Sequence, residues 1–195
     1  CFLDLPPMES GGHRNDPPVL LALGGTRHDK GLDILLKALE GVKAPFQLVI
    51  AGKPEDFDEN YIVSHTEKYR DRVRLCLRFL SDEEVKEFLV VSDIIVLPYR
   101  REFDGASGPM CEGIYLGKTI IGPSHGSLGS QLKSSHAGYT FESENAEQLA
   151  ACIEYALEHP CIYDKTACQM QKELSPELFA ERYLRIYREI LQKKS

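Results

Sequence analysis

The chain has 195 residues, 43% of them hydrophobic, and a formal net charge of −7. This suits one globular domain that buries its core without disulfides or a structural metal. The acidic balance argues against a non-specific nucleic-acid binder, and no apolar run is long enough to span a bilayer. The six cysteines form no CxxC pair and the six histidines lack ligand spacing. We therefore expect reduced cysteines, no metal site and a cytoplasmic location.

Residues 1–18 contain four prolines and two glycines among polar residues, which predicts a linker cut from a longer chain. Apolar runs typical of buried strands then alternate with amphipathic segments typical of helices. Strands are predicted at 19–23, 46–51, 73–77, 94–97, 119–121 and 138–141. Helices are predicted from about 31, around 61–69, from the capping box at 81–84, from 109, after 126, from 145, at 163–173 and from 176.

This alternation predicts an α/β fold, a Rossmann-like three-layer α/β/α domain with a mostly parallel sheet of about six strands. The domain would span residues 19–174, followed by a C-terminal helix over 175–195. That helix carries apolar residues at helical spacing, which we expect to face inward. The residues are Phe179, Tyr183, Ile186, Tyr187 and Ile190. Packing on the domain's own sheet is the simpler interpretation, and docking on another domain is the alternative.

Two loops after predicted strands carry candidate binding residues, because ligands of parallel sheets bind beyond the carboxyl ends of the strands. The first contains Gly24 and Gly25, whose amides can approach a ligand closely, with Arg27 and Lys30 beside a helix start. These features suit a diphosphate, although a plain turn with two solvated basic residues explains them equally well. Neither GxGxxG nor GxxxxGK[ST] is present.

The second loop follows the strand at 94–97 and is the stronger candidate. It runs through Asp104, Gly105, Ala106, Ser107 and Gly108 into a helix. Its amides and the helix dipole favour an anion, and Glu112 lies one turn into the helix, where a carboxylate can accept two hydrogen bonds from a ribose diol. The alternative is a solvated loop and a common first-turn acid. The small-residue loop 122–130 would wall the same crevice, with His125 as a surface or packing residue.

Taken in order, these motifs resemble the C-terminal domain of family 4 glycosyltransferases, which are retaining enzymes of the GT-B fold. The resemblance covers roughly residues 19–160, and it is specific to the family rather than to a substrate. It rests on Gly24, Arg27 and Lys30-Gly31, on segments 48–52 and 92–98, on Asp104 and Glu112 at their spacing, and on 116–122 and 126–129.

The resemblance implies roles for these residues around a nucleotide-diphosphate sugar. Arg27 and Lys30 would hold the diphosphate and Glu112 the ribose, while Asp104 would lie near the donor sugar. Amides of 105–108 would meet the sugar and phosphates, and the region of Phe79 and Leu80 would meet the base. Asp104 and Glu112 are the candidate catalytic residues that the resemblance implies, and no cofactor or metal is expected.

The resemblance also implies a partner domain. An N-terminal acceptor domain of the same protein would complete the enzyme, and any peripheral membrane association would pass through it. The fragment alone is expected to bind a nucleotide sugar weakly and to transfer nothing.

Two residues depart from the family pattern and leave room for a degenerate domain. Gly25 stands where many members have an arginine, and Asp104 replaces a glutamate. A nucleotide-sugar 2-epimerase on the same fold and a degenerate, non-catalytic donor-binding module are the two alternative functions.

Overall fold

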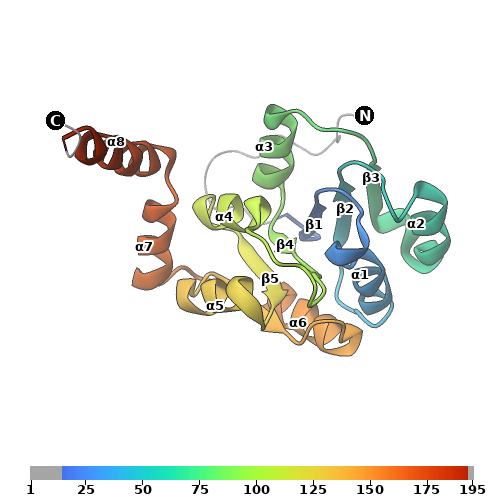
Figure 1. The fold of residues 1–195 in the computed structure, drawn as a ribbon. Coiled ribbons are helices and arrows are strands. Elements are labelled where there is room, and N and C mark those ends of the chain that lie inside the picture. Colours follow the sequence, from blue (N-terminus) through green and yellow to red (C-terminus); the bar gives the residue numbers. More distant parts are fainter. Residues whose placement is uncertain (1–14, 193–195) are drawn as a thin grey trace.

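The computed structural model describes residues 15–192 and contains a six-stranded parallel sheet (Figure 1). The strand order is β3-β2-β1-β4-β5-β6, and neighbouring strands are all parallel. The strands are β1 (Val19–Leu23), β2 (Gln47–Ala51), β3 (Val73–Cys76), β4 (Ile94–Val96), β5 (Thr119–Pro123) and β6 (Gly138–Phe141). The predicted Rossmann-like α/β/α class is confirmed, and β5 extends two residues beyond its predicted end.

Helices cover both faces of the sheet because side chains of successive strand residues point to opposite faces. Leu20 and Ile94 pack in one core layer, while their neighbours Leu21 and Ile95 pack in the other. The first layer is covered by α1 (Leu32–Leu39), α2 (Glu59–His65) and α6 (Ala146–Glu158). The second is covered by α3 (Asp82–Val91), α4 (Gly108–Tyr115) and α5 (Gly126–Ser135). The remaining helices are η1 (His28–Lys30), η2 (Glu67–Arg72), α7 (Lys165–Glu173) and α8 (Pro176–Gln192).

The helix starts follow the capping residues in the sequence. Ser81 and Glu84 form the predicted capping box of α3, and Asn145 accepts a hydrogen bond from the backbone of α6. Helix α4 begins one residue before its predicted start, because Ser107 acts as its N-cap and accepts from the N–H of Met110 at 3.3 Å.

The strand order places the candidate loops together. β1 and β4 are adjacent, and the chain leaves them toward opposite halves of the sheet. The loops after β1 and β4 therefore open a crevice at the carboxyl edge, the usual ligand position in doubly wound sheets. This edge includes both loops that the sequence singled out.

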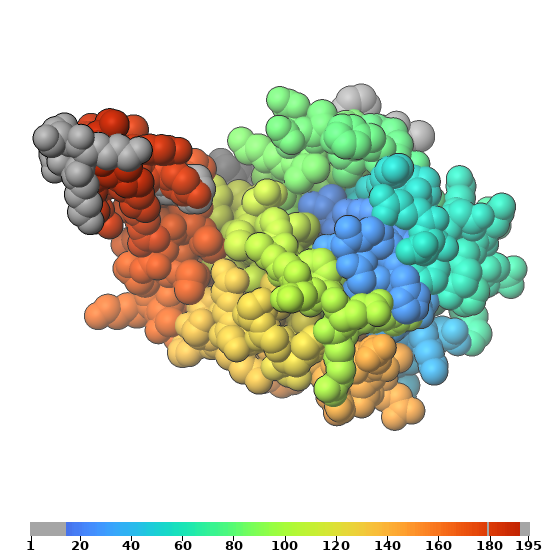
Figure 2. All heavy atoms as spheres, viewed as in Figure 1, coloured from blue at the N-terminus to red at the C-terminus, as the bar shows by residue number. Residues whose placement is uncertain are grey.

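The predicted packing of the C-terminal helix is wrong. Tyr183, Ile186, Tyr187 and Ile190 are between 46% and 60% exposed, and α8 packs against α7 instead of the sheet. Figure 2 shows this helix projecting beyond the body of the domain. Periodicity identified an apolar face of the helix, but the described chain offers that face no layer to cover.

The predicted linker lies mostly outside the described residues, which begin at Asn15. The side chain of Asn15 donates to the backbone oxygen of Val91 at 2.9 Å and to Asp93 at 2.8 Å. The cysteines among residues 15–192 are free thiols. Within the same range, no helix combines the length and apolarity needed to cross a bilayer.

Candidate functional site

The loop after β1 is held close to the loop after β4. It forms the short helix η1 and turns at Gly31, whose φ of 65° lies in the left-handed region. A Cβ at Gly31 would lie 2.1 Å from the carbonyl oxygen of Pro98. Only glycine fits this turn, and the close approach brings Lys30 over the start of the second loop.

Lys30 occupies an aromatic slot in this crevice. Its Nζ lies 4.0 Å from the ring centroid of Tyr99 and 4.2 Å from that of Phe103. Burial, and then the nearby charge of Arg27, lower the pKa of Lys30 to about 8. No carboxylate in the described chain reaches salt-bridge distance of Lys30, so its charge is available to an incoming anion.

Arg27 is arranged differently from Lys30. Its guanidinium makes two hydrogen bonds to Asp29, at 2.9 and 2.6 Å, and its side chain is half exposed. This pairing raises the pKa of Arg27 and lowers that of Asp29. Only Lys30 of the two predicted diphosphate cations is therefore free of a carboxylate.

The loop after β4 wraps around the same slot. The phenol of Tyr99 lies 3.4 Å from the hydroxyl of Ser107, and a Cβ at Gly105 would contact the ring of Phe103 at 3.4 Å. The N–H groups of Gly105 and Ala106 donate no hydrogen bond within the described chain.

The two candidate carboxylates lie on this loop and on the helix that follows it. Asp104 is exposed and makes no polar contact within residues 15–192. Glu112 lies on the first turns of α4, where its Oε1 is 3.8 Å from a Cβ position at Gly108. Partial burial, and then the charge of Asp82, raise the pKa of Glu112. A hydrogen-bond donor such as a ribose hydroxyl would relieve this desolvation.

The predicted base-binding segment lies between β3 and α3. Phe79 is 82% exposed, and Leu80 is partly buried in the core layer under α3. Arg78 donates to the carbonyl oxygen of Phe79 at 3.0 Å and pairs with Glu84, which holds the backbone here. Helix α3, which follows this segment, contacts α4, the helix that carries Glu112.

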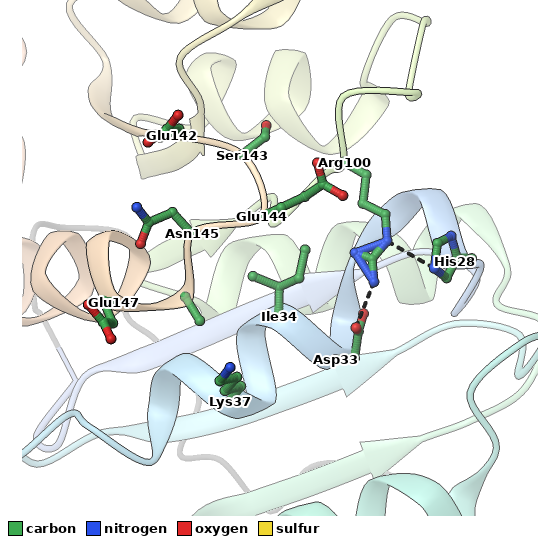
Figure 3. A pocket seen from close by; sticks show the side chains of 11 residues that line it. His28, Asp33, Ile34, Lys37, Arg100, Glu142, Ser143, Glu144, Asn145 and Glu147 are labelled. Carbon is green, nitrogen blue, oxygen red and sulfur yellow. Dashed lines mark hydrogen bonds and ion pairs between the residues drawn. The ribbon is translucent and has the colours of Figure 1, made fainter.

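A second hollow opens beside the slot, between α1, the loop after β4 and residues 142–147 (Figure 3). Its volume is about 710 Å³, whereas the cavity directly under Lys30 holds only about 30 Å³. Arg100 lines the larger hollow, and its guanidinium donates to Asp33 at 2.6 Å and to His28 at 3.1 Å. Arg100 thus ties the two predicted loops together rather than offering a free charge.

Several residues that shape the site were not assigned roles from the sequence. Tyr99 and Phe103 form the aromatic slot of Lys30, and Asp29 pairs with Arg27. Arg100 connects the loop after β4 to α1 through Asp33. For Tyr99 and Phe103, the available signal was two aromatic residues in the loop after the predicted strand at 94–97. No group of three or more His, Cys, Asp or Glu side chains in the described part of the chain is arranged to hold a metal.

Comparison with known proteins defines the family. The model of the family described as glycosyl transferases group 1 matches residues 8–174, and the chain belongs to this family. An uncharacterized glycosyltransferase of Methanocaldococcus jannaschii is 26% identical over 175 residues, which cover 90% of this chain and 48% of that protein. The chain therefore spans about half the length of this curated relative.

Solved structures share the fold. Sucrose-phosphate synthase of Thermosynechococcus elongatus superposes with a TM-score of 0.73 at 18% identity, over 91% of this chain and 46% of that one. HepE of Anabaena, solved in complex with UDP, superposes with a TM-score of 0.66 at 16% identity, over 82% of this chain and 44% of that one. The architecture is thus that of GT-B glycosyltransferase domains.

Proposed function

We propose that this chain is the donor-binding domain of a retaining glycosyltransferase and that its ligand is a nucleoside-diphosphate sugar. The full enzyme would transfer the sugar to an acceptor hydroxyl in polysaccharide or glycoconjugate synthesis, with the acceptor bound by another part of the protein. The family membership and the UDP complex of the Anabaena relative support this proposal.

The observation that carries the proposal is the position of Lys30. A lysine ammonium lies on two aromatic faces at the switch point of the sheet, with no carboxylate partner among the described residues and a pKa of about 8. A partly desolvated, unpaired cation beside two unbonded loop amides suits a diphosphate better than a neutral ligand.

The other residues divide the donor between them. The carboxylate of Glu112, partly desolvated and without a hydrogen-bond partner in the described chain, would accept from the ribose hydroxyls. The exposed ring of Phe79 would cover the base beside Leu80. Asp104, exposed on the loop after β4, would contact the donor sugar.

The proposed chemistry follows from the charge that develops in the reaction. As the bond between the sugar and the diphosphate breaks, negative charge grows on the departing phosphate oxygen. The ammonium of Lys30 and the amides of Gly105 and Ala106 would stabilise that charge without reorganising, which is the main source of catalysis in such sites. The proposal includes no metal ion or cofactor.

Calorimetric titration of this chain with UDP, GDP and ADP, and with their sugars, tests the proposal. We expect one of the three series to bind weakly, with the free nucleotide retaining most of the affinity. The absence of heat from all of them at millimolar concentration would refute the donor-site assignment. Assaying product from a longer chain that includes an acceptor domain separates transfer from epimerisation.

A further inference from the structure

The turn that follows β1 already has a carboxylate against it. A Cβ built on Gly25 would lie 3.2 Å from both Cδ and Oε1 of Glu55, and 3.3 Å from its Oε2. The Glu55 carboxylate thus occupies the space directly over Gly25. The N–H of Gly25 donates no hydrogen bond within the described chain.

The backbone under this carboxylate is firmly held. The hydroxyl of the buried Thr26 accepts from the N–H of Glu55 at 2.8 Å and donates to the carbonyl oxygen of Phe57 at 2.7 Å. The N–H of Thr26 donates to the carbonyl oxygen of Lys53 at 3.0 Å. The loop after β2 is therefore hydrogen-bonded to the loop after β1. These bonds bring Glu55 next to Gly25.

The carboxylate itself is weakly held by contrast. Its ion-pair partner in the described chain is Lys53, whose Nζ lies 3.9 Å away on a side chain that is 66% exposed. No hydrogen bond to either of its oxygens is present among residues 15–192. Rotation of the Glu55 side chain would clear the space over Gly25 without disturbing the backbone.

Glu55 also changes the charge of the turn. The loop after β1 carries Arg27 and Lys30, and Asp29 already neutralises the first of them. The charge of Glu55 reaches this loop, since it contributes to raising the pKa of Arg27. The charges of Arg27, Lys30, Asp29 and Glu55 therefore lie around the place where the proposed diphosphate would enter.

We propose that Glu55 is an internal competitor for the anion-binding turn at Gly25, and that its carboxylate must swing away when a diphosphate binds. Glu55 thereby limits donor affinity, and its removal makes the charge around the turn more positive by one unit. The inference rests on the proposed function only in taking the ligand to be a nucleoside diphosphate.

The test compares Glu55→Gln with Glu59→Gln, an exposed carboxylate of α2 whose loss changes the net charge equally. UDP, GDP, ADP and inorganic pyrophosphate are titrated into each variant and the wild type at one pH and ionic strength. We expect Glu55→Gln to lower the dissociation constants of the nucleotide and of pyrophosphate by the same factor, about five- to tenfold. This is the scale for removing one like charge a few ångströms away. Glu59→Gln should bind as the wild type does.

The outcomes separate this inference from the function on which it rests. If the wild type binds and the affinity of Glu55→Gln is the same or lower, the proposed role of Glu55 is wrong. The donor-site assignment is then unaffected. Equal tightening by Glu59→Gln also overturns the role of Glu55, because the effect is then one of net charge. If none of the three proteins binds any of the four anions, the proposed function fails and the inference fails with it. Thermal melts show that each variant is folded.

Discussion

Lys30 gives the sharpest test of the proposed site, because its charge should have opposite effects on folding and on binding. The pKa of Lys30 is lowered from 10.5 to about 8, mainly by burial. At about 1.4 kcal/mol per pH unit, this amounts to roughly 3 kcal/mol against the charged form at neutral pH. A substitution that removes the charge regains only about 1 kcal/mol of this, because partial exposure to water screens the cost and the contact of the side chain with the faces of Tyr99 and Phe103 is lost as well.

Replacing Lys30 with methionine keeps the length of the side chain and removes its charge. We expect the free energy of unfolding at pH 7 to rise by about 1 kcal/mol, since the desolvated cation is gone. We expect nucleotide affinity to fall by about 2 kcal/mol, the usual scale for a charge-assisted contact. Urea unfolding and calorimetric titration measure the two quantities separately. A variant that loses stability and affinity together would refute the reasoning, because Lys30 would then be a structural residue.

The pH dependence provides an independent check. With a pKa of about 8, Lys30 is about 90% protonated at pH 7 and about 10% at pH 9. Because a bound diphosphate favours the protonated form, affinity should weaken about tenfold between these pH values. Arginine stays charged throughout, so Lys30→Arg should abolish this dependence. In the free protein the unfolded chain binds more protons between pH 8 and 10.5, so the contribution of Lys30 to stability rises across that window. Wild-type affinity that is flat from pH 7 to 9 would refute the assignment.

Substitutions at Arg100, Gly31 and Glu112, two of them with a matched control, test the rest of the site. Arg100→Ala should destabilise the domain by about 2 kcal/mol in a denaturant melt, because it leaves the partly buried carboxylate of Asp33 unpaired; Arg100→Lys should recover part of the loss. Gly31→Ala should cost at least about 3 kcal/mol, since the new methyl group meets a backbone oxygen at 2.1 Å. Gly126→Ala, at nearly the same φ in open space, should cost only about 1 kcal/mol, and equal losses would rule out the clash. Glu112→Ala should weaken nucleotide binding by about 1–3 kcal/mol while leaving the melt nearly unchanged, and undiminished affinity would mean that Glu112 does not hold the ribose.

The amino-acid pattern alone determined the order and type of the elements. Apolar runs marked each strand, and caps such as Ser81 and Asn145 marked helix starts, because both signals are local. The alternation of the two element types required a parallel sheet with glycine-rich loops at one edge. This was enough to identify the two loops from which the candidate site is built.

The tertiary structure decided which side chains meet. Arg27 and Lys30 are three residues apart and both basic, yet one pairs with Asp29 and the other lies on the rings of Tyr99 and Phe103. Glu55 reaches Gly25 only because Thr26 joins the loops after β1 and β2. The apolar face of α8 was visible in the sequence, but its packing was not. Periodicity shows that a face is apolar, whereas the surface that covers it depends on contacts between segments far apart in the chain.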